Sequence, residues 1–382
     1  MVDFTYHNPT KIEFGREKEK QIGAHIAAGG IKKVLLCYGS ERIKTNGLFD
    51  VVAQSLELHG VACVELGGIV SNPLLSKVYE GIETAREHGV GAILAVGGGS
   101  VLDSVKAIAA GVPYGGDVWD FFTGKAVIAE ALPVFDVMTL AATGSEMNGY
   151  AVITNEATRQ KYSIASEHVY PAVSVINPEL TQSVPDDYLA YSAVDIIAHV
   201  IEGYFTATVQ PHFQSRMVES IVKTVMETTE FLLERPDDYN ARAEFAWAAT
   251  QALNGSTTAG TGGLSFPNHM IEHSLSALFN VPHGAGLAIV IPAWMQWYEG
   301  HNPEQFGRFA RTIFGLSEPL EGIAALKAWF DRIGAPTTLG AASISGDSIG
   351  AITENAGQLA ALMGLSEQYA PQGIAEILAY AK

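Results

Sequence analysis

The sequence contains few cysteines, few basic residues and no long apolar run. Only Cys37 and Cys63 occur among its 382 residues. Both stand in short apolar segments, VLLCY and VACVEL, which predict buried strands rather than a disulfide framework. Lys and Arg number 23 against 41 Asp and Glu, so the formal net charge is -18, which argues against nucleic acid and anionic membranes as partners.

Transmembrane and secretory signals are also missing. The longest apolar segment, Leu287 to Trp297, contains Pro292 and falls well short of the roughly 20 residues that span a bilayer. The start of the chain, MVDFTYHNPT, has no basic stretch followed by an apolar one, so we expect no signal peptide. A soluble cytoplasmic protein is expected, and its length predicts two domains.

The two halves of the sequence have different patterns. After an expected hairpin formed by FTYH and KIEFG, the apolar segments VLLCYG, VACVEL and AILAVG alternate with helical segments. This alternation predicts βαβ units and a parallel sheet with helices on both faces. From about Leu189 onward apolar residues recur at helical spacing without strands between them, and Pro178 and Pro185 bracket a polar link. We predict an α/β domain over residues 1–182 and an all-α domain over residues 183–382.

The second half carries aspartate and histidine residues at helical spacing. Asp195 and His199 are four residues apart in DIIAH, so a helix places both on one face, close enough to bind a single divalent ion. His269 and His273 share a helical face in the same way, and His283 follows in a Pro-His-Gly turn. One carboxylate and neutral imidazoles, with no cysteine nearby, favour a catalytic Fe(II) or Zn(II) ion over structural zinc.

Each of these residues also has an ordinary structural interpretation. A single histidine is more often a core or capping residue than a metal ligand, and Asp195 could accept hydrogen bonds as a helix N-cap. However, three histidines fall in one short segment, and Asp195 and His199 stand in an otherwise apolar run. An unpaired carboxylate buried there costs free energy that a metal ion removes, so we favour the metal.

Glycine-rich segments end several predicted strands of the first half. Gly97–Ser100 follows an apolar strand directly and opens a helix, an arrangement in which backbone N–H groups and the helix dipole hold a phosphate. Taken alone, this segment could equally be a plain turn, and it lacks the GxGxxG pattern. Tyr38–Ser40, Thr139 and Thr143–Ser145 also follow strands. Polar strand ends on one sheet outline a crevice and favour a dinucleotide.

Four segments together resemble the iron-containing, or group III, alcohol dehydrogenases: GGGSVLDSVKAIAAG, TLAATGSEMNGYAVITN, DIIAHVIEGYF and HMIEHSLSALFNVPHGAGLAIVIPAW. Within that family the chain is similar to the butanol dehydrogenase and NADPH-dependent aldehyde reductase branch. The resemblance covers essentially the whole chain. It implies a Rossmann-like amino-terminal domain, an all-helical carboxy-terminal domain, a metal and cofactor site in the cleft between them, and a homodimer.

The resemblance also assigns residues by position. It implies metal ligands at Asp195, His199, His269 and His283, a nicotinamide-proximal His273, a pyrophosphate loop at Gly98, Gly99, Ser100 and Asp103, and further cofactor contacts at Asn72, Thr139, Asn148 and Lys161. Two departures from the family pattern, Val101 in place of proline and AATGSE in place of AGTGSE, remove no polar group.

The residue at position 39 bears on the choice of cofactor. Family members that prefer NAD often have aspartate there, which hydrogen-bonds the ribose 2′-hydroxyl and repels a 2′-phosphate. Gly39 and Ser40, with Arg42 and Lys44 nearby, leave room and positive charge. We therefore predict NADP(H), although Arg42 and Lys44 could equally be solvated surface charges, with NAD(H) as the alternative.

The predicted function is a metal-dependent alcohol dehydrogenase or aldehyde reductase that transfers hydride between NADP(H) and a primary alcohol or aldehyde such as butanol or butanal. His273 is the candidate to relay a proton, or only to orient the nicotinamide. Phe266 in SFPNHM suggests a pocket for uncharged aldehydes. The alternatives are an NAD-dependent, glycerol-type polyol dehydrogenase and a non-catalytic, metal-dependent nucleotide-binding protein. A dehydroquinate synthase would need a basic cluster that the metal motifs lack.

Overall fold

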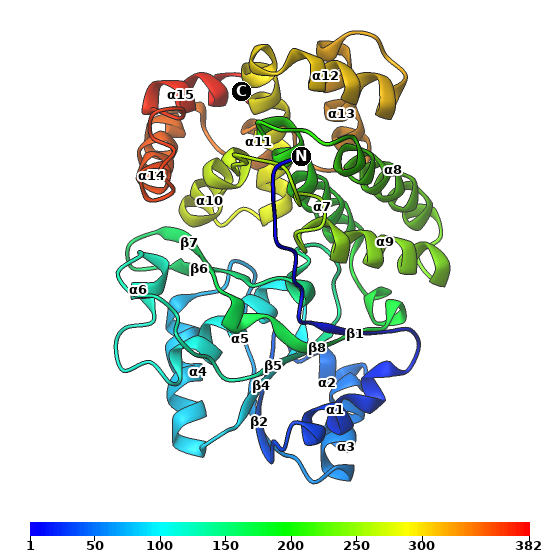
Figure 1. The fold of residues 1–382 in the computed structure, drawn as a ribbon, viewed down its shortest axis with the longest axis vertical. Helices are drawn as coiled ribbons and strands as arrows, with labels where there is room; N and C mark the ends of the chain where they lie inside the picture. The colour runs from blue at the N-terminus through cyan, green and yellow to red at the C-terminus, as the bar shows by residue number, and fades with distance from the viewer. The chain divides into compact units, whose positions relative to one another are not determined.

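The computed structural model describes all 382 residues. The chain forms two compact units, His7–Ser183 and a second unit of Met1–Tyr6 with Val184–Lys382. The first contains a parallel sheet with helices and the second consists of helices (Figure 1), which confirms the predicted fold class. None of the helices is long and apolar enough to cross a membrane.

A six-stranded sheet with the order β1-β8-β5-β4-β2-β3 forms the centre of the α/β unit. Every neighbouring pair in it is parallel. The inner strands β2 and β4 are continuous apolar runs because both of their faces are covered. The strands are β1 (Lys11–Phe14), β2 (Lys33–Tyr38), β3 (Ala62–Leu66), β4 (Ala92–Gly97), β5 (Val134–Met138) and β8 (Pro171–Ile176).

Helices alternate with these strands along the chain, and a separate antiparallel pair lies outside the sheet. Helix α1 packs on α3, and α4 packs on α5. The helices are α1 (Ile22–Ala28), α2 (Arg42–Thr45), α3 (Leu48–Leu58), α4 (Leu75–His88), α5 (Gly99–Gly111) and α6 (Trp119–Phe122), and the antiparallel pair is β6 (Tyr150–Asn155) and β7 (Gln160–Ala165).

The strand order reverses between β2 and β4. From β2 the chain passes through α3 to the edge strand β3, whereas from β4 it passes through α5 to β5 on the other side. In parallel sheets of this type ligands bind beyond the carboxyl ends of the strands at such a reversal. Tyr38 pairs with Val96, so Gly39 and Gly97 end neighbouring strands at this point.

Two predictions about strands were wrong. The expected amino-terminal hairpin does not form, because only Lys11–Phe14 is a strand and it pairs in parallel with β8. Met1–Tyr6 belong to the helical unit instead, where Val2 N donates to Gly260 O at 2.9 Å. Cys63 is exposed rather than buried because β3 is an edge strand, while Cys37 is buried, and both are free.

The helical unit contains no β-sheet strand. Helices α7 and α11 are apolar on nearly every side, and most of their residues are buried. Helix α8 buries a stripe that includes Val218, Val222 and Val225 at helical spacing. Proline opens α10, α12, α13 and α15, where its missing N–H has no cost. The helices are α7 (Asp186–Thr206), α8 (His212–Glu234), α9 (Tyr239–Ala252), α10 (Pro267–Phe279), α11 (His283–Tyr298), α12 (Pro303–Phe309), α13 (Pro319–Arg332), α14 (Ile349–Leu362) and α15 (Pro371–Ala379).

Candidate metal centre and nucleotide-binding surface

Three helices bring the four predicted metal ligands together. Asp195 and His199 lie one turn apart on α7, His269 lies in the first turn of α10, and His283 begins α11. The Oδ1 atom of Asp195 lies 3.6 Å from Nε2 of each of the three histidines. Asp195 is buried, so one carboxylate oxygen is the common neighbour of three imidazole nitrogens.

These residues fit a divalent metal ion. The 3.6 Å separations are too long for hydrogen bonds. In a tetrahedral site with bonds of about 2.1 Å, however, the ligand atoms stand roughly 3.4 Å apart. Oδ1 of Asp195 and Nε2 of His269 are buried without a hydrogen-bond partner, a costly state that a cation relieves. Three imidazoles and one carboxylate suit Fe(II) or Zn(II).

The electrostatics of the cluster favour the same interpretation. Burial lowers the pKa of His199 to about 3, so its ring stays neutral and its Nε2 can act as a ligand. Burial also acts on His269, but the carboxylates of Glu202 and Asp195 raise its pKa to about 10. The neighbouring histidines hold the pKa of Asp195 below its usual range against the effect of burial. A concentration of negative charge that holds a proton on His269 also attracts a divalent cation.

Two buried glutamates that the sequence did not identify orient the ligands. Glu202 on α7 accepts a hydrogen bond from Nδ1 of His269, and Glu272 on α10 accepts one from Nδ1 of His283. Both glutamates are fully buried. Each bond fixes the proton on Nδ1 and leaves Nε2 to face Asp195, as carboxylates do in many metal sites. The only sequence signal is that each glutamate follows a ligand histidine by three residues.

Two glycines in the segment PHGAG allow the start of α11 to pack closely against α7 and α10. A Cβ atom on Gly284 would lie 2.0 Å from the carbonyl oxygen of Tyr191 on α7. A Cβ atom on Gly286 would lie 2.7 Å from Oε1 of Glu272. Both positions therefore need glycine, and the close approach sets His283 at the start of the helix beside the other ligands.

His273 and Phe266 also lie at the metal cluster. His273 is buried on α10, with its ring centroid 5.7 Å from that of His283 and 6.4 Å from that of His269. The ring of Phe266 lies 5.9 Å from that of His269, edge to face. The predicted relay histidine and the predicted apolar residue thus border the ligands.

The predicted phosphate-binding residues meet at the carboxyl ends of β2, β4 and β5. Gly98 is the N-cap of α5, and Gly99 and Ser100 form its first turn. Thr139 follows β5, and its N–H donates to Gly97 O at 3.0 Å. Gly39 follows β2. The unpaired N–H groups of a helix start at a sheet reversal form a surface suited to a pyrophosphate.

Asn72 and Lys161, both predicted cofactor contacts, bind each other. The Nζ of Lys161 on β7 lies 2.9 Å from Oδ1 of Asn72, and both residues are buried. Asn72 has a φ of 52°, a left-handed conformation that often marks functional segments. Thr154 N also donates to Pro73 O at 2.8 Å, so the segment around Asn72 is tied to the β6–β7 pair.

Asp103 and Asn148, the other predicted cofactor contacts, are engaged within the unit. Asp103 accepts hydrogen bonds from Ser145 Oγ at 2.8 Å and from Val152 N at 3.0 Å. The amide of Asn148 donates to the carbonyl oxygens of Thr143 and Gly144 and accepts from Tyr150 N. These hydrogen bonds hold the segment that follows β5 in place. In this structure, therefore, the side chains of Asp103 and Asn148 stabilise the protein segment around the predicted cofactor site.

The basic residues near Gly39 differ in their surroundings. Lys44 Nζ lies 2.8 Å from Glu65 and 3.3 Å from Glu41, and it also faces the ring of Tyr38 at 5.1 Å. The charges of Glu41 and Glu65 therefore balance the charge of Lys44. Of the two basic residues expected near the ribose, Arg42 is the one with a charge left to interact with a phosphate.

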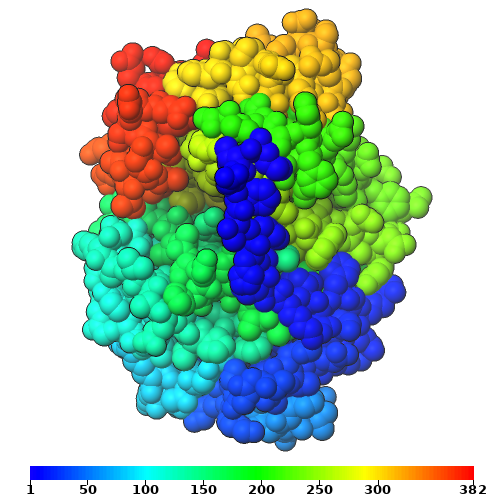
Figure 2. All heavy atoms as spheres, in the orientation of Figure 1, coloured from blue at the N-terminus to red at the C-terminus, as the bar shows by residue number.

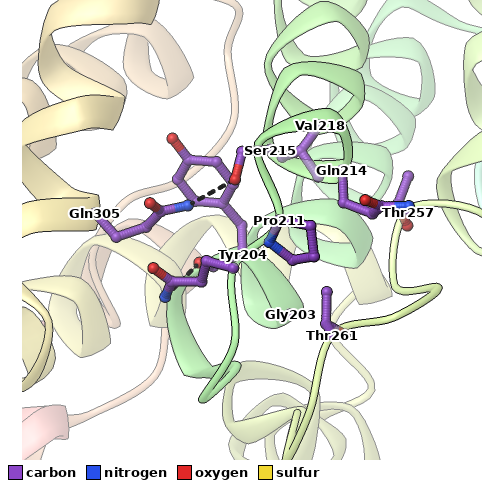
Figure 3. Close-up of a pocket in the computed structure, with 10 residues that line it drawn as sticks. Gly203, Tyr204, Pro211, Gln214, Ser215, Val218, Thr257, Thr261 and Gln305 are labelled. Carbon is purple, nitrogen blue, oxygen red and sulfur yellow. Dashed lines mark hydrogen bonds between the residues drawn. The ribbon is translucent and has the colours of Figure 1, made fainter. Parts of the chain in front are cut away.

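A small pocket in the helical unit lies apart from these residues (Figure 3). It contains none of the predicted metal or cofactor residues, and Gln305 donates to Ser215 across it at 3.3 Å. Oε1 of Gln214 is buried there without a partner, which suits a bound water molecule. Its lining residues are Gly203, Tyr204, Gln210, Pro211, Gln214, Ser215, Val218, Thr257, Thr261 and Gln305.

Comparison with known families places the chain. Residues 9–178 match the family model described as iron-containing alcohol dehydrogenase, and residues 189–381 match the carboxy-terminal model of the Fe-containing alcohol dehydrogenase family. The chain belongs to the iron-containing alcohol dehydrogenase family. Membership confirms the resemblance and makes the protein an alcohol dehydrogenase with a nicotinamide cofactor and a divalent metal.

Individual relatives agree with this assignment. A probable NADH-dependent butanol dehydrogenase of Bacillus subtilis is 40% identical over 93% of this chain and 94% of its own. The NADPH-dependent aldehyde reductase YqhD of Escherichia coli is 35% identical over 92% of each. The crystal structure of NADH-dependent butanol dehydrogenase A from Thermotoga maritima is 47% identical, with a TM-score of 0.97 over 100% of this chain and 99% of that one.

Proposed function

We propose that the protein reduces primary aldehydes such as butanal, and oxidises the corresponding alcohols, by hydride transfer to and from NADP(H). The observation that carries the proposal is the position of Asp195 Oδ1, 3.6 Å from three imidazole nitrogens. Relatives named as butanol dehydrogenases and an aldehyde reductase support the substrate class. The edge-on ring of Phe266 beside His269 supports an uncharged substrate.

Each residue of the metal centre has a role in this reaction. Asp195, His199, His269 and His283 would hold one Fe(II) or Zn(II) ion, which when bound supplies Lewis acidity toward the substrate oxygen. Glu202 and Glu272 keep protons on the Nδ1 atoms of their histidines and so hold Nε2 in the ligand position. His273, which borders His283, delivers the proton that the product oxygen requires in reduction.

The α/β unit supplies the nucleotide site of the proposal. The N-terminus of α5 at Gly98–Ser100 binds the pyrophosphate, and the end of β2 meets the adenosine ribose. Gly39 has no carboxylate that would repel a 2′-phosphate, and Ser40 and Arg42 follow it. These residues support NADP(H).

NAD(H) is the second candidate for the cofactor. Lys44 is paired with Glu65 and Glu41, so the charge available to a 2′-phosphate is smaller than the sequence predicts. Several relatives are named as NADH-dependent. The two cofactors differ only in the 2′-phosphate, so the rest of the proposed site serves either one.

We also propose that the protein is a homodimer. Strand β1 is an edge of the sheet, with one side open to pairing. The preceding arm lies on the surface (Figure 2), and Met1, Val2, Phe4 and Tyr6 on it expose large apolar side chains. An edge strand on one unit and exposed apolar side chains on the other each suit association with a second copy.

The experiment that tests the function is a transfer of deuterium from nicotinamide C4. The metal-loaded protein is mixed with butanal and with NADPH or NADH deuterated at C4, and the butanol is analysed by mass spectrometry. Deuterium at C1 of butanol is expected because the hydride passes directly between the two carbons. Absence of butanol with both nucleotides would reject the activity, and butanol without deuterium would reject direct hydride transfer.

A further inference from the structure

A lysine in the α/β unit is completely buried, and the proposed reaction does not use it. Lys106 lies on α5, about two turns beyond the phosphate-binding start of that helix at Gly99, and its exposed fraction is 0%. Lysine is almost never fully buried unless its charge is compensated. Its ammonium group therefore needs an explanation.

Five oxygen atoms surround the ammonium of Lys106. Nζ lies 2.7 Å from Ser145 O, 2.8 Å from Ser145 Oγ, 2.8 Å from Asn148 O, 3.1 Å from Asn148 Oδ1 and 2.9 Å from Tyr150 O. An ammonium has only three N–H groups, so this shell resembles the oxygen cage of a monovalent cation. All five oxygens belong to one short segment that follows β5.

The neighbouring carboxylate of Asp103 completes this network. Ser145 Oγ accepts from Lys106 and donates to Asp103 Oδ1 at 2.8 Å. Asp103 Oδ2 accepts from Val152 N at 3.0 Å. Asp103 and Lys106, three positions apart on α5, therefore bind residues 145–152 with side chains of opposite charge.

The segment that Lys106 holds borders the proposed phosphate site. A Cβ atom on Gly99 would lie 2.5 Å from the side chain of Thr143, so Thr143 packs directly against the turn that opens α5. The amide of Asn148 fixes the Thr143 carbonyl at 3.3 Å, and Lys106 fixes Asn148. A continuous chain of contacts thus runs from the ammonium to the phosphate-binding turn.

We infer that Lys106 is a positioning residue for the nucleotide, whose ammonium serves as an internal cation that folds residues 143–150 against the start of α5. The inference rests on the proposed nucleotide site but not on the aldehyde substrate. Removing the ammonium takes away the donor that these five oxygen atoms share, which costs free energy even when the volume is kept. The segment then moves away from Gly99 and nucleotide affinity falls.

The ionisation of Lys106 agrees with this role. Burial lowers its pKa to about 8, while the carboxylates of Asp103, Asp136 and Glu146 act to raise it. The folded value lies below the ordinary value of lysine but above neutrality, so the ammonium is charged at pH 7. Raising the pH through about 8 removes the proton, and the affinity for nucleotide should fall with it.

Matched variants of the whole protein test the inference. Lys106→Met keeps most of the volume without the charge, and Lys106→Ala opens a cavity at the cage. NADPH affinity is measured by fluorescence titration, and metal content reports on the helical unit. We expect Lys106→Met to bind NADPH roughly 10 to 100-fold more weakly, as for loss of hydrogen bonds to a charged group, with metal content unchanged. Its affinity should no longer depend on pH near 8.

Added cations can show whether Lys106→Ala loses nucleotide affinity because the charge is missing or because a cavity is left. Propylammonium or K⁺ should restore NADPH binding to Lys106→Ala, because either can approach the oxygen atoms of the cage directly. Tetramethylammonium should not restore it, because its four methyl groups keep the charge away from those oxygens. NADPH binding by Lys106→Met within twofold of the parent would overturn the inference. Equal rescue by tetramethylammonium would also overturn it.

If both lysine variants fail to fold, a milder variant can still test whether Lys106 positions the nucleotide. Ser145→Ala removes the hydroxyl that joins Lys106 to Asp103, and we expect NADPH binding to weaken several-fold at unchanged metal content. Parent-like binding in Ser145→Ala would count against the inference. If the parent binds NADPH but does not reduce butanal, the proposed function fails while the inference about Lys106 stands.

Discussion

The carboxylate of Glu272 accepts a hydrogen bond from Nδ1 of His283, and neither residue is predicted by sequence spacing to meet the other. Glu202 and His269 form the equivalent pair. Both glutamates are fully buried, where a carboxylate without a partner is strongly unfavourable. The candidate metal centre therefore combines the four predicted ligands with two carboxylates, each of which sets the orientation of one histidine.

The Glu272–His283 pair predicts a specific loss of metal affinity. Glu272→Gln retains the shape but weakens the hold on the Nδ1 proton, so we expect metal to bind about 10 to 100-fold more weakly. Equilibrium dialysis against a competing chelator measures this. Glu219→Gln is the matched control, since Glu219 is a buried carboxylate paired with Arg308 and Tyr204 elsewhere in the unit. Equal metal affinity in Glu272→Gln and Glu219→Gln would contradict the role of Glu272.

Removal of a predicted metal ligand should reduce metal binding more than Glu272→Gln does. His283→Ala deletes one of the three imidazoles around Asp195, so we expect low metal occupancy and loss of turnover, while NADPH binding by the α/β unit persists. His301→Ala, a histidine outside the cluster, should behave like the parent. Metal analysis and nucleotide titration of both variants check this. A His283→Ala protein with full metal content and normal activity would remove His283 from the site.

Sequence spacing anticipated that the four predicted metal ligands could lie together, but it did not anticipate the glutamates that contact them. Asp195 and His199 share one helix, so a spacing of four residues already places them together. Glu202 and Glu272 were missed because each contacts a histidine on a different helix, and such contacts depend on how α7, α10 and α11 pack. Gly284 and Gly286, which permit that packing, carry no spacing signal.

The prediction of the fold was correct where the spacing of apolar residues is strongly periodic. It was wrong where only the local sequence pattern was available. Continuous apolar runs identified β2 and β4, because inner parallel strands are buried on both faces. The alternation before Lys11 suggested a hairpin, yet the residues there bond to the loop at Gly260 instead of to a strand. Tertiary contacts outweighed the local preference, as they also do for the exposed Cys63 on an edge strand.

Cofactor choice can be tested at Gly39. In Gly39→Asp a carboxylate would face the 2′-phosphate of NADPH, and after screening we expect a repulsion of roughly 1 to 3 kcal/mol. The ratio of kcat/KM for NADPH over NADH should then fall about tenfold to a hundredfold. A Cβ atom at this position would lie 3.1 Å from Ile69 O, so Gly39→Ala is needed as the control for crowding.

The parent, Gly39→Asp and Gly39→Ala must be compared at one ionic strength, because salt screens the repulsion between the carboxylate and the phosphate. Gly39→Ala should lower both kcat/KM values alike and leave their ratio near that of the parent. A parent that already prefers NADH would contradict the proposed use of NADP(H). An unchanged ratio in Gly39→Asp would show that residue 39 does not set cofactor choice.

The edge strand predicts the oligomeric state. If β1 and the arm before it form the dimer contact, the full-length chain should have the mass of a dimer in light scattering. Deletion of residues 1–14 should give monomer or aggregate, because it removes β1 and exposes β8 as a new edge. A monomeric full-length chain would reject the proposal.

We propose that the cluster around Asp195 binds the metal ion on which aldehyde reduction depends. The most direct measurement is the rate of butanal-dependent NADPH or NADH oxidation as metal-free protein is titrated with Fe(II) or Zn(II). We predict no oxidation without metal and a rate that rises to a plateau at one ion per chain. An undiminished rate in metal-free protein, or no oxidation of either nucleotide at saturating metal, would contradict the claim.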